Sequence, residues 1–291
     1  AATGNLTAFD MYRIHGSANA GFLQPTLSVK ITSQTITNLA NAFRGATAKS
    51  FHRSLEEFEF FGTCNVTTFN SAFFNCTELS KVKGNFEDVT NIGQMLGYTG
   101  DIDISELQFA TSGISTANQL FKNSLTRKIT GTVGAALFKG VRYPLSIMEN
   151  AASLVTVGTS TNPVRFDSMD NVGGFTQAFS GCTSLKQAYF LEAQTAPKSI
   201  YRMFRGCYSL GRIETIDCSN VTNTTAAFEN NKSLEWLRVT GMPISFSIED
   251  CNMAREGLVQ VFNDLPSVSA TITITDNPGV GDLTAEDLAI A

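Results

Sequence analysis

The 291-residue chain is apolar and sparingly charged: 43% of its residues are hydrophobic, 16% are charged and 22 are phenylalanine. This composition is too apolar for a disordered chain. An excess of 26 acidic over 21 basic side chains, with no basic run, argues against nucleic acid as a partner. No stretch approaches the roughly eighteen consecutive apolar residues of a membrane-spanning helix, so we expect no membrane insertion.

The first 34 residues contain two runs with strand character, LTAFDMYRIHG and TLSVKIT, on either side of Pro25. We expect residues 1–34 to form an N-terminal β cap, or a junction to an upstream domain. The chain opens with AATGNLTAFD, which contains neither Met nor a signal-like segment. We therefore interpret it as a mature or excised fragment.

Residues 35–245 carry a repeat with a period of about 25 residues. In each unit an aliphatic or small residue is followed seven positions later by a bulky apolar anchor. The predicted anchors are Phe43, Phe73, Leu96, Phe121, Leu154, Phe179, Phe204 and Phe228. Such spacing predicts a solenoid, in which each unit completes its apolar core only against its neighbours.

The clearest unit, VTNTTAAFENNKSLEWLRVTG, starts at Val221. Val221, Thr225 and Phe228 recur at helical spacing, which predicts a short helix. The second half alternates, with Leu234 and Leu237 pointing inward, as in a half-buried strand. We therefore expect an α/β solenoid: a leucine-rich-repeat-like, right-handed stack of about eight rungs, with a parallel β-ladder on one side and short helices or turns on the other.

Three cysteines share one position of the repeat. Cys76, Cys182 and Cys207 each stand three residues after an anchor phenylalanine. Neighbouring rungs bring such positions within disulfide reach, but parallel side chains meet the required dihedral angle poorly. We expect buried free thiols that pack as small hydrophobes, and no CxxC pair indicates a zinc or redox centre.

Residues 246–291 are expected to form a C-terminal cap of helix, strand and helix. MAREGLVQVFNDLPSV places Leu258, Val261, Phe262 and Leu265 on one helical face, and ATITIT alternates like a strand. LTAEDLAIA then opens a second helix with a capping box that starts at Thr284. Such a cap would cover the apolar end of the stack.

Three segments, DCSNVTNTTAAFENNKSLEWL, NVTTFNSAFFNCTELSKV and NVGGFTQAFSGCTSLKQA, resemble the leucine-rich repeats of the BspA-like class, whose usual motif is similar to NVTNMSxMFxGCxSL. The resemblance covers residues 35–241. It weakens over 125–170, where we expect an enlarged rung or a segment that is not a true repeat. Proteins of this class occur at bacterial surfaces and in bacteriophage tails.

The resemblance implies a non-enzymatic recognition or adhesion module without a cofactor. We expect a bacteriophage tail or receptor-binding protein, located in the virion tail or at an extracellular or cell surface. Its partners would be a bacterial cell-surface polysaccharide or protein and other virion subunits, and the protein would form a homo-oligomer. The alternatives are a structural virion protein that packs subunits through the solenoid, and a bacterial surface adhesin of the same repeat class.

The outward positions of the predicted strands are the candidate binding residues. They are Lys81, Lys83, Gln187, Tyr189, Arg212, Glu214, Trp236 and Arg238. Stacked strands would align them in two columns with a step of about 4.8 Å. Trp, Tyr and Arg are the residue types in which binding energy concentrates, although any exposed strand face has a similar composition.

The sequence gives little support for catalytic activity. His15 and His52 have no acidic or nucleophilic neighbour in a recognisable spacing. Asp101 and Asp103 would share one face of a strand, and a carbohydrate-active enzyme is a third hypothesis that depends on this pair alone. The common phosphate, hydrolase and zinc-protease motifs do not occur. We expect no catalytic residue and no metal site.

Overall fold

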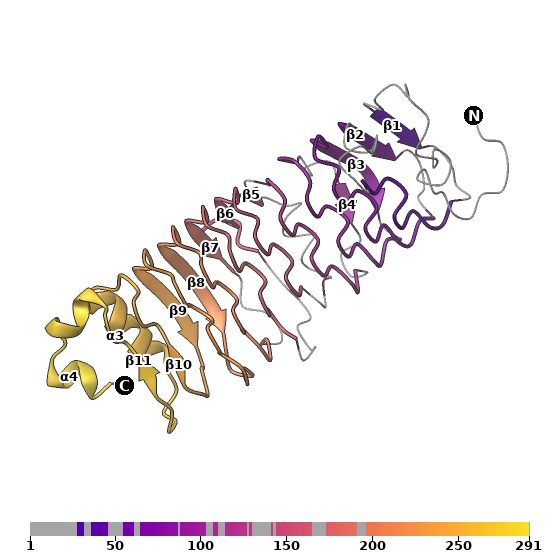
Figure 1. The fold of residues 1–291 in the computed structure, drawn as a ribbon. Coiled ribbons are helices and arrows are strands. Elements are labelled where there is room, and N and C mark those ends of the chain that lie inside the picture. Colours follow the sequence, from indigo (N-terminus) through magenta and orange to yellow (C-terminus); the bar gives the residue numbers. More distant parts are fainter. Residues whose placement is uncertain are drawn as a thin grey trace.

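In the computed structural model the chain forms an elongated stack of rungs, with β1 near one end and α4 at the other (Figure 1). The structure describes residues 28–31, 36–45, 55–60, 65–86, 88–102, 107–109, 114–126, 128–129, 141, 144–164, 173–190 and 196–290. The run LTAFDMYRIHG lies outside these residues, whereas TLSVKIT contains the first strand.

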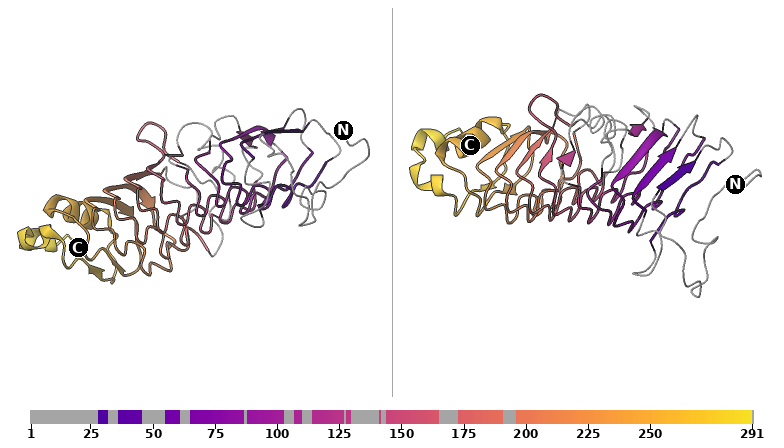
Figure 2. Two further views of the ribbon diagram at one scale, coloured as in Figure 1. Left: turned by 45° about the horizontal axis from the view of Figure 1, so that its top comes forward. Right: turned by 90° about the horizontal axis from the view of Figure 1, so that it is seen from above.

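Two parallel ladders run along the same side of the stack (Figure 2). The first contains β1 (Ser28–Ile31), β2 (Glu57–Phe60), β3 (Lys81–Phe86) and β4 (Leu107–Phe109). The second contains β5 (Lys128–Ile129), β6 (Thr156–Val157), β7 (Gln187–Tyr189), β8 (Arg212–Asp217) and β9 (Trp236–Thr240). Neighbours in sequence are neighbours in each ladder and pair in parallel, which confirms the predicted solenoid.

A column of apolar anchors fills the axis of the stack. Its members, each at most 1% exposed, are Phe43, Phe73, Leu96, Phe121, Met148, Phe179, Phe204 and Phe228. The rings of Phe179 and Phe204 stack with centroids 5.4 Å apart, and Phe228 continues the stack at 6.4 Å from Phe204. The rungs are therefore in register along a shared core, as their spacing in the sequence predicted.

One anchor differs from the prediction, because Met148 and not Leu154 occupies the column. The N–H of Phe121 donates to the carbonyl of Ile147, and the N–H of Met148 donates to the carbonyl of Ala178, in the next rung. Leu154 is also fully buried, so periodicity alone did not distinguish it from the true anchor. The step from Phe121 to Met148 is 27 residues, close to the general period.

The side opposite the ladders is made of turns that bond to one another across the rungs. The N–H of Asn41 donates to the carbonyl of Asn70 at 2.9 Å, and the N–H of Phe43 donates to that of Ala72 at 2.9 Å. Between these bonds, the N–H of Ala42 closes a tight turn onto the carbonyl of Leu39 within its own rung. The turns thus satisfy their backbone groups through the neighbouring rung as well as locally.

The short helix predicted at the start of the unit at Val221 is wrong, and turns, the alternative in the predicted fold, are present there. Over residues 221–228 the chain forms a bridge and turns, and Thr225 is exposed while Val221 and Phe228 are buried. Within the described residues, every α-helix lies in the C-terminal segment beyond residue 254. Bonds between rungs replace the helical hydrogen bonds that the local spacing predicted.

Left-handed backbone explains why the turns do not continue as helices. Two positions of the turn segment, four residues apart, have φ between +50° and +74° in rung after rung. The pairs are Ser71 with Asn75, Gln94 with Tyr98, Gln119 with Asn123, Ser146 with Asn150, Gln177 with Gly181, Arg202 with Gly206, and Ala226 with Asn230. The N–H of the left-handed residue donates to the adjacent rung, as Ser71 does to the carbonyl of Gly93, and the following N–H, that of Ala72, donates within its own rung.

The repeated cysteines are buried free thiols, as predicted. The thiols of Cys76, Cys182 and Cys207 donate to main-chain carbonyls of the preceding rung at 3.0 to 3.1 Å. Burial raises the pKa of the Cys207 thiol to about 12. These side chains therefore act as small core residues with one weak hydrogen bond each.

The last segment caps the stack with α3 (Arg255–Asp264), accompanied by β10 (Phe246–Ser247), β11 (Ile272–Thr273), the 3-10 helix η2 (Pro278–Asp282) and α4 (Ala285–Leu288). As predicted, Leu258, Val261 and Phe262 of α3 are buried. The capping box of Thr284 with Asp287 is also present. Within the described part of the chain, no helix has the length and hydrophobicity needed to cross a bilayer.

Helix α3 lies against β9, the last strand of the second ladder. The N–H of Asn252 donates to the carbonyl of Leu234, and the N–H of Gly241 donates to that of Asp264. Gly257 allows α3 to approach the backbone of Glu235 closely, because a Cβ atom at this position would lie only 2.6 Å from the carbonyl oxygen of Glu235. The helix therefore covers a strand edge that would otherwise be open to further pairing.

Replacing Phe204 by Ala tests the shared core. We expect the free energy of unfolding to fall by roughly 3 to 5 kcal/mol, because the residue is fully buried between two stacked rings. Urea denaturation followed by circular dichroism measures the change. Tyr208→Ala in the same rung, where the side chain is 52% exposed, is the control and should have little effect. Equal effects of the two variants would contradict the stacked core.

Two glycines of one rung test the left-handed turns. Gly206 has φ +72° and open space around its Cβ direction, so Gly206→Ala should destabilise the protein by roughly 1 to 2 kcal/mol through the backbone alone. Gly211 has no left-handed φ and only ordinary contacts, so Gly211→Ala should stabilise it by about 0.4 to 1 kcal/mol. Thermal denaturation of both variants measures the opposite signs, and a gain in stability for Gly206→Ala would refute the assigned conformation.

Candidate functional site

The structure divides the predicted binding residues between the two ladders. Lys81 and Lys83 lie on β3 in the first ladder, where Lys83 forms an ion pair of 3.3 Å with Glu59 on β2. The other six residues lie on β7, β8 and β9 of the second ladder. Within the described residues no strand pairing joins the two ladders, so these two groups of candidates lie on separate sheets.

Five residues of the second ladder form a compact surface, which we call the strand-face patch: Gln187, Tyr189, Arg212, Glu214 and Trp236. Gln187, Arg212 and Trp236 are directly paired across the three strands and make one row. Tyr189 pairs with Glu214 in a second row. Each row therefore contains one aromatic and one charged residue: Trp236 with Arg212, and Tyr189 with Glu214. Backbone hydrogen bonds fix the spacing of the strands that carry them.

The centre of the strand-face patch is a guanidinium stacked on an indole. The guanidinium carbon of Arg212 lies 4.8 Å from the centroid of the Trp236 ring. The Nε atom of Arg212 donates to the carboxylate of Glu214 at 2.5 Å. The Arg212 side chain is 45% exposed. This arrangement holds a planar cation and an aromatic face in one orientation, ready for a polar ligand.

The neighbouring strand adds hydrogen-bonding groups. The hydroxyl of Tyr189 donates to the side-chain carbonyl of Gln187 at 3.3 Å, and both residues are partly exposed. The only carboxylate of the patch, Glu214, is already bound by Arg212. The patch can therefore accept and donate hydrogen bonds and stack, whereas it lacks the pair of free carboxyls that glycoside hydrolysis uses.

Arg238 has a structural contact that the sequence did not indicate. Its Nε atom donates to one carboxylate oxygen of Asp264 on α3 at 2.5 Å, and a terminal nitrogen donates to the other oxygen at 2.9 Å. The Asp264 side chain is only 7% exposed. The hydrogen bond with Asp264 is the main reason why the pKa of Arg238 is raised. Arg238 thus fastens the cap to β9 beside the strand-face patch.

Of the four residues that the sequence offered for catalysis, the structure describes only Asp101. Asp101 is exposed in a bend outside the strands, and Asp103, His15 and His52 lie outside the described residues. Among the residues described, no group of three or more His, Cys, Asp or Glu side chains could hold a metal ion.

Sequence analysis missed a second polar surface, on the turn side. Asn, Gln, Ser and Thr side chains from five rungs line a groove there of about 580 Å³. The available signal was the recurrence of amide and hydroxyl residues two positions before the anchor, as in Gln94, Gln119, Ser146 and Gln177.

Residues 10–132 and 162–236 match the family described as "Mycoplasma protein of unknown function, DUF285", and the chain belongs to this family. Together with the parallel solenoid, this match supports a BspA-like repeat protein. No curated protein matches the chain. Among solved structures, it is similar to a leucine-rich cell surface protein from Faecalibacterium prausnitzii, with 12% identity, a TM-score of 0.23, and coverage of 92% of this chain and 90% of that one.

Removing the Arg238 side chain tests its structural role. Arg238→Ala leaves the carboxylate of Asp264, which is 7% exposed, without its bidentate partner. We expect the free energy of unfolding to fall by roughly 1.5 to 3 kcal/mol. Arg212→Ala is the matched control, because its ion pair is exposed and should contribute less than about 1 kcal/mol. Similar urea midpoints for the two variants would contradict the assignment.

Proposed function

We propose that this protein is a non-enzymatic recognition module that presents the strand-face patch to a polysaccharide or protein of a bacterial surface. The observation that carries this proposal is the stacked pair of Arg212 and Trp236, held at the centre of a three-strand surface. Arg and Trp are enriched among residues that contribute most to binding. Aromatic faces also pack well against sugar rings.

The rigidity of the three strands that carry the strand-face patch favours ligand binding over catalysis. The three strands are joined by backbone hydrogen bonds, and their inward-facing residues Ala188, Ile213 and Leu237 are fully buried. A surface of this kind is formed before the ligand arrives, so little conformational entropy is lost on binding. Shallow and preorganised surfaces bind extended partners better than they enclose a reacting group.

We place the protein at an extracellular or cell surface, as a bacterial adhesin or as a receptor-binding component of a bacteriophage tail. In either setting several copies on one particle would multiply weak contacts into avidity, and a homo-oligomer would do the same. The partner is then a component of the bacterial envelope. Other virion subunits are additional partners in the phage setting.

A structural virion protein that packs subunits through the solenoid is the second candidate. The covered edge of β9 weighs against end-to-end growth at this end of the stack, because α3 occupies the place of a further strand. In this second function the subunits would pack laterally through the strand-face patch. The two functions differ in what the patch contacts: an envelope component in the first, another subunit in the second.

The test combines Arg212→Ala with Trp236→Ala in the 291-residue chain and measures adsorption of the labelled protein to a panel of whole bacterial cells. We expect at least a tenfold loss of adsorption, corresponding to about 1.4 kcal/mol or more. Arg205→Ala is the control, because Arg205 forms an exposed ion pair with Glu229 on the turn side.

Circular dichroism must show that the double variant keeps its fold. Unchanged adsorption by a folded double variant would refute binding through the strand-face patch. Sedimentation equilibrium of the same proteins distinguishes the second candidate. A loss of oligomer mass without a loss of adsorption would support subunit packing.

A further inference from the structure

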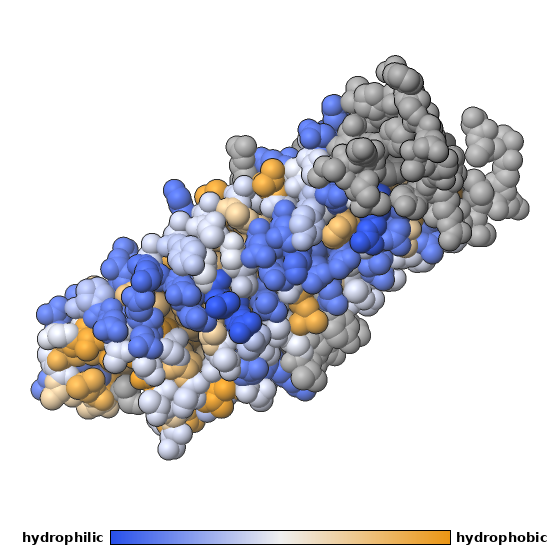
Figure 3. Space-filling model, viewed as in Figure 1, coloured by the Kyte–Doolittle hydropathy of each residue, from blue (hydrophilic) through white to orange (hydrophobic). Residues whose placement is uncertain are grey.

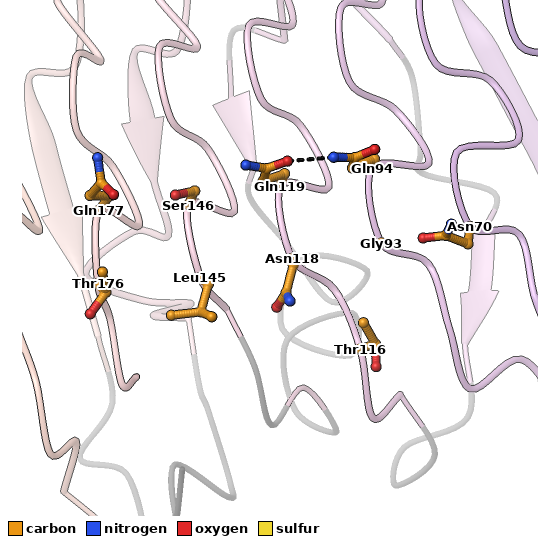
Figure 4. A pocket seen from close by; sticks show the side chains of 10 residues that line it. All are labelled: Asn70, Gly93, Gln94, Thr116, Asn118, Gln119, Leu145, Ser146, Thr176 and Gln177. Carbon is orange, nitrogen blue, oxygen red and sulfur yellow. Dashed lines mark hydrogen bonds between the residues drawn. The ribbon is translucent and has the colours of Figure 1, made fainter. Parts of the chain in front are cut away.

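The groove on the turn side crosses five successive rungs (Figure 4). Its lining residues are Asn70, Gly93, Gln94, Thr116, Asn118, Gln119, Leu145, Ser146, Thr176 and Gln177. Four steps between rungs at about 4.8 Å give it a length of roughly 19 Å. No lining residue is charged, and only Leu145 is a large apolar side chain.

The polar side chains of the groove follow two rows. Gln94, Gln119, Ser146 and Gln177 form one row, and Asn118 and Thr176 lie in a second row below it in Figure 4. In the first row a hydrogen-bonding side chain therefore recurs at four successive rungs, at a step comparable with the length of one sugar ring. A ligand that matches this pattern is extended along the stack and carries repeated hydrogen-bonding groups.

Part of this hydrogen-bonding capacity is unused within the protein. Gln94 donates to the side-chain carbonyl of Gln119 at 2.5 Å, which joins two members of the row. Asn118 Oδ1 has no donor in the described structure, although it is buried. The hydroxyl of Ser146 and the amide of Gln177 also have no protein partner among the described residues. Such groups are available to a polar ligand.

The backbone supplies an independent argument. The row that contains Gln94, Gln119, Ser146 and Gln177 has φ between +50° and +58°. Four residues later, the second left-handed position is mostly occupied by Asn or Gly, the residues that this conformation favours. The Gln residues at the first position of three groove rungs are therefore not explained by the backbone preference.

We propose that this groove binds a neutral oligosaccharide laid along the stack axis, at a site separate from the strand-face patch. Amide groups donate and accept hydrogen bonds, as sugar hydroxyls do. A peptide fits less well, because the main-chain N–H groups of Phe69, Ser71 and Phe73 are already bonded to the next rung and cannot pair with a peptide backbone. The uncharged lining offers no cation to an acidic polysaccharide.

The experiment titrates the 291-residue chain with cellohexaose, mannohexaose and isomaltohexaose, and with the acidic hexamer of galacturonic acid, by isothermal calorimetry. We expect at least one neutral hexamer to bind and the acidic hexamer to bind at least tenfold more weakly. Two-dimensional NMR of the unmodified chain should then show shifts of the side-chain amides of Asn118 and Gln177. The absence of binding by all three neutral hexamers at millimolar concentration would overturn the proposal.

Gln177→Gly separates binding from folding. Glycine suits the left-handed backbone of this position, and the Gln177 amide has no protein partner, so the variant should unfold at an equal or higher urea concentration. Its affinity for the neutral hexamer should nevertheless fall at least fivefold. A lower urea midpoint with unchanged affinity would show a structural role for the side chain and overturn the assignment.

Ala226→Gly is the matched control, because Ala226 occupies the equivalent left-handed position two rungs away, with φ +54°, and does not line the groove. It should leave the affinity for the hexamer unchanged. The strand-face patch is tested separately by cell adsorption, so its failure there would not affect the comparison of these two variants. An equal loss of hexamer affinity in Ala226→Gly and Gln177→Gly would overturn the proposed location.

Discussion

The hydrogen bonds between rungs are the constraint on which the whole structure depends. On the strand side they form the parallel ladders, and on the turn side the N–H groups of Asn41 and Phe43 donate to the next rung in the same way. A single rung cannot satisfy these groups by itself, and water is excluded from the column of anchors between them. Each rung therefore requires a neighbour, and α3 takes this role beside β9.

Features that depend on residue type at a fixed spacing could be predicted from the sequence. The stacked rings of Phe179, Phe204 and Phe228, the cysteine column and the capping box of Thr284 follow from such patterns. The helix over residues 221–228 did not, because a spacing of three and four residues also suits a compact turn. What distinguishes the two is a bond to another rung, and a local pattern contains no information about it.

The same limit applies to the candidate sites. Alternation along the strands identified the outward positions, including Arg212 and Trp236, which are paired across β8 and β9. Their surroundings depend on the register between distant segments. Arg238 meets Asp264, which is 26 residues away in the cap, and no local rule predicts this pair. The groove was missed for a related reason, because its rows become visible only once the left-handed turns are known.

The two faces of the solenoid share one scaffold but present different chemistry. The strand side carries ions and aromatic rings, such as Arg212 on Trp236, whereas the groove on the turn side is lined by neutral amides such as Gln177. Because the buried anchors and backbone bonds hold the rungs, most outward side chains contribute little to folding, and Arg238, which is bonded to Asp264 of the cap, is an exception. Gln177 is an example of the majority on the turn side: glycine would suit its left-handed backbone, and its side-chain amide has no protein partner among the described residues, so the fold does not require this side chain and a ligand can use it.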